Sequence, residues 1–320
     1  MSQQVDWVVV QLALEHRLFR CGGNEFQKLF SDIMQLVHGD DFIRVKPHGS
    51  LGDEGVDGYF LIGDIVYQCY GAEDGKVQKL SAVGEKMVGD FETAVENNPD
   101  MKEWKFTHNL LSGLPKQLLD VLVTLREKGA SRNVKVGQLS LPGFLKLVDE
   151  LDPRGRERIL GTKAIAQDRL RQLPDAVNEI IDEVMEKAPT FALAAGPPQA
   201  ISPRKLTHND IPFMWQENLK RGFTYGSIVY DCVARHGDPD AATSAPSYFK
   251  NLYQNLDANG LAAGEILRFI HADLCGESPR FDDLRALAAL GVMASMFENC
   301  EIFEDPPEGE PETLNYDPAQ

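Results

Sequence analysis

Strand-type sequence is confined to the first half of this chain, and that contrast limits the fold more than any other feature. Short β-branched and aromatic runs bounded by glycine or polar residues, which are typical of strands, lie at 60–63, 65–70, 104–111 and 134–140. Apolar residues at helical spacing precede, separate and follow them, at 5–19, 24–37, 76–96, 116–128 and 142–151. This alternation predicts an α/β domain whose mixed sheet is flanked by helices, with parallel pairing in its second part.

The second half of the chain contains only helical patterns. A long amphipathic helix is expected at 168–187, and a segment rich in Ala, Pro and Gly follows it as a linker. Five further helices are expected, at 208–221, 225–236, 246–257, 263–274 and 281–299. We therefore predict an α/β domain over 1–160, a connector helix and linker over 161–203, an all-helical domain over 204–300, and a disordered acidic tail over 301–320.

Charge and cysteine usage restrict the partners. The net charge of −17 opposes simple nucleic-acid binding, which needs a basic surface, so a DNA substrate would require a partner protein to supply much of the grip. The five cysteines are scattered without a CxxC pair, which indicates reduced thiols in the cytoplasm. The chain has no long apolar run and no signal-peptide pattern, so no membrane association is expected.

The stretch from Arg44 to Gly71 carries the candidate chemistry. Asp57 enters a strand from a glycine-rich turn, and Gln68 is expected roughly opposite it on the antiparallel partner strand. Carboxylate and amide oxygens at one end of a hairpin are ligands that Mg²⁺ accepts. Asp53, in the same turn, is interpreted as a turn former. The pattern raises the hypothesis of metal-dependent phosphodiester cleavage.

A third ligand is expected from the first long helix of the α/β domain. Glu25 near its start offers a carboxylate, and Gln27 is the competing choice. The two residues lie about 200° apart around the helix, so both cannot face one site from their own positions.

These segments, GNEFQKLFSDIM, GDEGVDGY and VYQCY, resemble in order and spacing the PD-(D/E)xK (restriction-endonuclease-like) nuclease superfamily. They are further similar to the effector nucleases of bacterial ABC-three-component (Lamassu-like) anti-phage systems. The resemblance covers about residues 20–145. It implies a restriction-endonuclease-like fold, a Mg²⁺ or Mn²⁺ site at Glu25, Asp57 and Gln68, and a DNA substrate. It also implies an SMC-like ABC ATPase and a small third subunit as partners, with the helical domain as the partner-binding region; homo-oligomer formation stays open.

One position departs from the family pattern. The lysine of the (Glu/Gln)-x-Lys motif, which orients water and offsets negative charge, is replaced by Tyr70. The next predicted helix offers Lys79 and Lys86, which are seven residues apart and share a face, as replacements. The alternative is a catalytically degenerate nuclease fold that serves only as an assembly subunit.

Overall fold

The computed structural model describes residues 7–45, 56–73, 77, 79–161, 169–187, 201–236, 248–276, 282–299 and 302–306. The chain divides into two compact units. The α/β unit spans residues 10–163, and the helical unit spans residues 164–320 together with the first nine residues. Asp53, in the predicted turn, and residues 307–320 of the predicted acidic tail lie outside the described residues.

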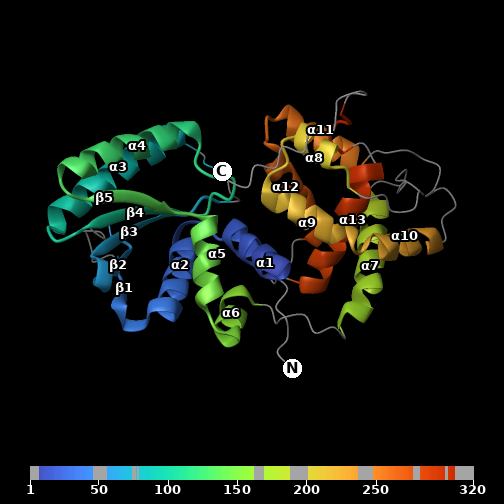
Figure 1. Cartoon of the computed structure of the whole chain (residues 1–320), viewed down its shortest axis with the longest axis horizontal. Coiled ribbons are helices and arrows are strands. Elements are labelled where there is room, and N and C mark those ends of the chain that lie inside the picture. The colour runs from blue at the N-terminus through green and yellow to red at the C-terminus, as the bar shows by residue number, and fades with distance from the viewer. Residues whose placement is uncertain are drawn as a thin grey trace. The chain divides into compact units, whose positions relative to one another are not determined.

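The α/β unit is built on one mixed sheet, whose five strands follow the order of the chain (Figure 1). They are β1 (Phe42–Arg44), β2 (Gly58–Phe60), β3 (Ile65–Tyr70), β4 (Glu103–His108) and β5 (Lys135–Leu139). The first three strands pair antiparallel, and β3, β4 and β5 pair parallel. The expected mixed sheet with parallel pairing in its second part is confirmed.

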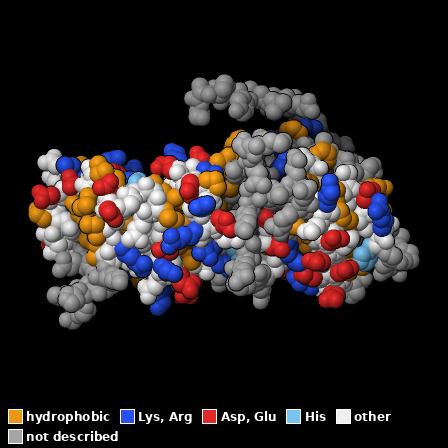
Figure 2. Space-filling view, turned by 90° about the horizontal axis from the view of Figure 1, so that it is seen from below, with side chains coloured by type: hydrophobic (Ala, Val, Ile, Leu, Met, Phe, Trp, Pro, Cys, Tyr) orange, Lys and Arg blue, Asp and Glu red, His pale blue; other side chains and the backbone are white. Residues whose placement is uncertain are grey.

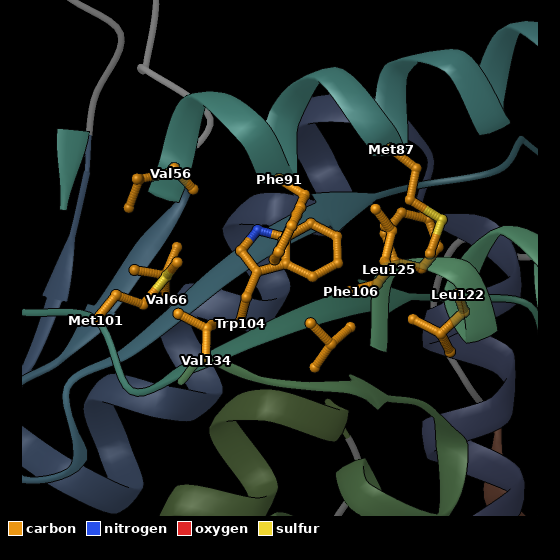
Figure 3. Packing of buried hydrophobic residues seen from close by; sticks show 12 residues of the cluster. Val56, Val66, Met87, Phe91, Met101, Trp104, Phe106, Leu122, Leu125 and Val134 are labelled. Atoms are coloured by element: carbon orange, nitrogen blue, oxygen red, sulfur yellow. The ribbon is translucent and has the colours of Figure 1, made fainter. Parts of the chain in front are cut away.

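Two crossover helices, α3 (Leu80–Asn97) and α4 (Lys116–Ser131), join the parallel strands and cover one face of the sheet (Figure 1). Both lie on the same face because the strand order advances in one direction and crossovers are right-handed. Figure 3 shows Phe91 of α3 against Trp104 of β4, with ring centroids 5.6 Å apart in an edge-to-face arrangement. The surrounding core comes from both helices and from the strands, including Val66, Met87, Phe106, Leu122, Leu125 and Val136.

The opposite face of the sheet packs against α2 (Gly23–His38) and α5 (Leu141–Glu150). Phe30 of α2 lies at the centre of this packing, with its ring centroid 5.3 Å from that of Tyr67 and 6.4 Å from that of Phe144. Residues Tyr67 and Gln68 are consecutive on β3, so their side chains point to opposite faces. Gln68 therefore lies on the α3 face.

The remaining helices of the α/β unit are α1 (Trp7–Arg20) and α6 (Pro153–Leu160). The sequence patterns did not predict α6, although Asp152 accepts a hydrogen bond from the Gly155 N–H at 2.6 Å as its N-cap and Pro153 is the first helical residue. The sequence of α6, PRGRERIL, is too short and too polar to show a helical apolar pattern. Strand β1 was also missed, because three residues give no readable alternation.

The helical unit contains seven α-helices among its described residues. They are α7 (Leu173–Lys187), α8 (Pro203–His208), α9 (Phe213–Phe223), α10 (Gly226–Arg235), α11 (Tyr248–Ala258), α12 (Ala263–Cys275) and α13 (Asp283–Asn299). Helix α13 is central and packs against α7, α9, α10 and α12. Gly222 of α9 allows a close approach to α13, because a Cβ at this position would lie 2.3 Å from the Leu290 carbonyl oxygen.

Three segments differ from the expected organisation. Helix α7, expected as a connector, packs against α10 and α13 through its buried apolar face and is part of the helical unit. Residues 302–306, expected in a disordered tail, contact the helical unit, because Ile302 and Phe303 bury their apolar side chains there. The expected helix at 208–221 begins later, at Phe213, as α9, because Asp210 is in the left-handed region and Pro212 precedes the helix. Helix α8 is an additional helix, which begins in the expected linker and ends at the first residue of the expected helix.

Candidate functional site

The hairpin of β2 and β3 brings Asp57 and Gln68 to the same end of two adjacent strands. Gly58 pairs with Tyr67, and the Asp57 N–H also donates to the Tyr67 carbonyl oxygen at 2.9 Å. The regular register therefore stops at Gly58, and Asp57 lies beside Tyr67 rather than directly opposite Gln68, because two successive residues of one strand meet one residue of the other. Asp57 and Gln68 are 4% and 2% exposed, respectively, so a carboxylate and an amide are buried at this end of the hairpin.

The Asp57 carboxylate is held by donors from two elements. Its Oδ2 accepts a hydrogen bond from the backbone N–H of Cys69 at 2.6 Å, and its Oδ1 accepts from the side-chain amide of Gln27. Charge-assisted hydrogen bonds of this kind offset the cost of removing a carboxylate from water. The Asp57 carboxylate is thus fixed between α2 and the end of β3.

Gln68 carries the clearest sign of a missing partner. Its Oε1 is buried and has no hydrogen-bond partner among the described residues. A buried acceptor without a donor costs about 1–3 kcal/mol, so buried polar atoms in native proteins are almost always paired. An amide oxygen in this state is available to a donor or to a hard cation.

Helix α2 presents Gln27 rather than Glu25 to the site. Gln27 contacts Asp57, and its backbone carbonyl oxygen accepts from the Ser31 hydroxyl at 2.8 Å. Glu25 lies exposed in the first turn of the same helix. The structure thus brings together Asp57 with the competing choice, and it places the expected third ligand on another side of the helix.

Lys79 and Lys86 line a pocket of about 450 Å³ at the end of β3. Tyr70, Met87 and Asp90 also line this pocket. The Lys86 ammonium forms an ion pair with Asp90 at 2.7 Å, whereas Lys79 makes no ion pair with any residue that the structure describes. Both lysines therefore lie beside the position where the family motif has its own lysine.

Tyr70 supplies no charge at that position. Its ring stacks on Phe106 with centroids 6.0 Å apart and an interplanar angle of 16°. Burial raises the pKa of the Tyr70 hydroxyl above its usual value, so the group stays neutral at physiological pH. The lysines that line the pocket beside Tyr70 are Lys79 and Lys86.

Asn109, directly after β4, is a positioning residue that the sequence patterns did not single out. Its Oδ1 accepts from the Ala72 N–H at 2.7 Å. Its Nδ2 donates to the carbonyl oxygens of Ala72, Leu18 and Cys21 at 2.8, 3.0 and 2.7 Å. These bonds fix the segment leaving β3, which forms part of the pocket wall. A lone asparagine after a strand gives no sequence signal for such a role.

The donor set fits a hard cation only in part. Asp57 offers one carboxylate and Gln68 one unpaired amide oxygen, both of the type that Mg²⁺ accepts while keeping several waters. The described residues contain no group of three or more His, Cys, Asp or Glu side chains arranged for a metal ion. A metal at this hairpin would therefore be held by few protein ligands.

Comparison of the chain with protein-family models, with curated proteins and with solved structures gives no match. Within the described residues, no helix is both long and apolar enough to cross a membrane. The function is therefore inferred from the residues of the hairpin, α2 and α3 and from their contacts.

Proposed function

We propose that the chain is a Mg²⁺- or Mn²⁺-dependent DNA endonuclease with a restriction-endonuclease-like α/β unit, which hydrolyses phosphodiester bonds at the β2–β3 hairpin. The observation that carries this proposal is the buried amide oxygen of Gln68, which has no partner among the described residues and lies on the strand next to the buried carboxylate of Asp57. A buried acceptor without a partner in a native protein calls for an explanation such as a bound ion.

The order of elements supports the finer fold assignment. Helix α2 precedes the hairpin, Asp57 leads into β2, a 3₁₀ turn (Leu61–Gly63) follows, and β3 carries Gln68. This is the order that the resemblance to the PD-(D/E)xK superfamily implies. The assignment rests on that order together with the burial of Asp57 and Gln68 at the same end of the hairpin.

Each residue has a distinct role in this proposal. Asp57 and Gln68 hold the ion, which when bound supplies an activated water and polarises the phosphate. Gln27 orients the Asp57 carboxylate through its amide. Lys79 offsets the negative charge of the phosphate from the N-cap position of α3, in place of the lysine that Tyr70 replaces.

The distribution of charge makes a DNA substrate more compatible with the α/β unit than the net charge of the chain suggests. The α/β unit has 20 Lys and Arg against 23 Asp and Glu, whereas the rest of the chain has 12 against 26. Most of the excess acid thus lies outside the proposed nuclease unit. Figure 2 shows basic and acidic side chains side by side on one face of the molecule, so a partner would still supply part of the grip on DNA.

The resemblance to anti-phage effector nucleases extends the proposal to a complex. The chain would act with an SMC-like ABC ATPase and a small third subunit, bound through the helical unit. In this assembly the ATPase partner would bring the DNA, which suits a chain with a net charge of −17.

A second function is favoured by the same site. The Asp57 carboxylate already accepts hydrogen bonds from Gln27 and Cys69, and Tyr70 stands where a lysine is expected. These features suit a catalytically degenerate nuclease fold that serves as an assembly subunit of such a complex. This function predicts no cleavage and no effect of Asp57 substitution on protection against phage.

Cleavage of supercoiled plasmid DNA by the purified chain, alone and with its complex, tests the two functions. In Mg²⁺ we expect nicked and linear products from the wild type and a loss of at least about 100-fold in rate for Asp57→Ala. Asp120→Ala, at an exposed position on α4, is the matched control and should cut like the wild type. Equal rates for wild type and Asp57→Ala would remove the active-site assignment.

A further inference from the structure

The pocket of about 450 Å³ at the end of β3 adjoins the candidate site. Cys69 takes part in both, because its backbone N–H donates to the Asp57 carboxylate at 2.6 Å and the residue also lines the pocket. Gln68 and Tyr70 lie on the same face of β3, about 7 Å apart along the strand. A DNA strand bound at Gln68 therefore reaches this pocket with the adjoining nucleotide.

Aromatic and aliphatic side chains form the apolar part of the pocket lining. Tyr70 is half-buried and stacks on Phe106 with an interplanar angle of 16°. Val83 and Met87 of α3 add aliphatic contacts. Aromatic side chains of this kind are platforms on which single nucleobases stack. A base inside a duplex is already stacked between its neighbours, so only an unpaired base can enter such a pocket.

Charged side chains of both signs complete the lining. Lys79 and Lys86 are cations, and Glu73 and Asp90 are anions, so the described lining residues carry two charges of each sign. A site for phosphate alone would be predominantly basic, because lysines have donors only and carboxylates repel the anion. The edges of a nucleobase present both donors and acceptors, which match ammonium and carboxylate groups together.

We propose that this pocket holds one unpaired nucleobase of a DNA strand, so that the substrate is DNA with single-stranded or unpaired nucleotides. The volume lies within the range of about 300–1,000 Å³ that is usual for small-ligand pockets, and it suits a single nucleotide rather than a segment of duplex. Tyr70 contributes the stacking surface, and Lys79 meets the phosphate of the same nucleotide. The choice of a DNA strand as ligand rests on the proposed nuclease function.

Binding of nucleotides in the absence of divalent cations tests the pocket separately from cleavage. Thymidine 5′-monophosphate is titrated with the full-length chain and followed by saturation-transfer difference NMR. We expect its base protons to receive more saturation than its sugar protons. Deoxyribose 5-phosphate, which lacks the base, should bind at least about fivefold more weakly. The trinucleotide of thymidine with a 5′-phosphate should bind at least as tightly as the mononucleotide, because the base is supplied by a strand.

Leucine substitutions on α3 provide a matched pair of variants. Ala82 is exposed and lines the pocket, whereas Ser81 is exposed and is not one of the lining residues. We expect Ala82→Leu to weaken binding of thymidine monophosphate at least about fivefold by occupying the pocket, and Ser81→Leu to change it less than about twofold. Tyr70→Leu keeps an apolar contact with Phe106 and removes the stacking ring, so it should also weaken binding at least about fivefold.

The possible results separate the pocket from the metal site. Equal affinities for thymidine monophosphate and deoxyribose 5-phosphate would overturn the nucleobase assignment, as would equal affinities of folded Ala82→Leu and Ser81→Leu or no binding by the wild type at millimolar nucleotide. Binding of the mononucleotide but not the trinucleotide would overturn the DNA strand as the source of the base and assign a free nucleotide. Base-dependent binding by a chain that cuts no plasmid DNA would contradict the nuclease function and leave the pocket assignment in place.

Discussion

The amide of Gln27 takes one side of the Asp57 carboxylate, a place that a cation would also favour. Gln27→Glu replaces this donor with a second acid, so like charges meet in a buried site. We expect the free energy of unfolding without metal to fall by about 1–3 kcal/mol. Added Mn²⁺ should restore it by bridging the two carboxylates, which chemical denaturation with and without Mn²⁺ would measure.

Glu25→Gln is the matched control for that variant, because Glu25 is exposed two residues away on the same helix. Its free energy of unfolding should stay within about 0.5 kcal/mol of wild type, with no added response to Mn²⁺. A Gln27→Glu chain that is no more responsive to Mn²⁺ than Glu25→Gln would contradict the placement of the ion beside α2.

The two lysines of the pocket should differ in their effect on cleavage. Lys86 is held by Asp90 at 2.7 Å, whereas Lys79 has no ion pair within the described part of the chain. We expect Lys79→Ala to lower the rate of plasmid cleavage about 100-fold and Lys86→Ala to lower it by less than about tenfold. The opposite ranking would assign the phosphate contact to Lys86. The ion pair between Lys86 and Asp90 would then have to open during the reaction.

His108 predicts a dependence of stability on pH. It is fully buried, its Nδ1 accepts from the Leu110 N–H, and burial lowers the pKa of its imidazole to about 4. In the unfolded chain His108 binds a proton with a pKa near 6.5. The stability that depends on neutral His108 is therefore complete above pH 6.5 and is lost as the pH falls toward 4. Between pH 7.5 and 5, wild type should lose about 2 kcal/mol more than His108→Gln in urea unfolding. Equal losses would show that His108 does not titrate on unfolding.

At the scale of elements, the strands and helices of the α/β unit were largely predictable because their apolar periods are distinct. The expected parallel pairing of β3, β4 and β5 is confirmed. The three-residue strand β1 was not predictable, because its place is fixed by pairing with β2 rather than by its own sequence. Helix α3 begins at Leu80, four residues later than expected.

The hairpin that carries the candidate site was predictable, but the positions of its side chains were not. The regular pairing of β2 and β3 stops at Gly58, so the expected placement of Gln68 opposite Asp57 does not follow from the register. The choice between Glu25 and Gln27 depends on how α2 is rotated against the sheet, which is set by the packing of Phe30 and its neighbours. Sequence alone left that choice open. It also could not separate Lys79 from Lys86, because the difference between them lies in the ion pair of Lys86 with Asp90.

Close contact between α4 and β5 gives an element-scale prediction. A Cβ at Gly129 would lie 2.5 Å from the Val134 carbonyl oxygen, whereas one at Gly89, on the outer side of α3, would meet nothing within 4 Å. Gly129→Ala should lower the free energy of unfolding by about 1–3 kcal/mol through overpacking. Gly89→Ala should raise it by about 0.5–1 kcal/mol through helix propensity. Calorimetry or urea unfolding would show whether the signs are opposite, and equal signs would contradict this packing.

At the scale of the whole molecule, the two units differ in chemistry. The α/β unit carries the buried carboxylate of Asp57 and the buried amide of Gln68 and is nearly balanced in charge, while the helical unit carries most of the excess acid. This division suits a chain that performs chemistry with one unit and binds partners with the other. The proposed nuclease and the proposed assembly subunit share this division and differ only in whether the hairpin holds a metal ion.

Binding of Mn²⁺ to the purified full-length chain, measured from the electron paramagnetic resonance signal of free Mn²⁺, tests that difference most directly. The account predicts one ion bound per chain at millimolar Mn²⁺ or below, lost in Asp57→Asn and weakened in Gln68→Leu, with both variants still folded by circular dichroism. Unchanged Mn²⁺ binding in Asp57→Asn, or no binding by the wild type, would contradict a metal site at this hairpin.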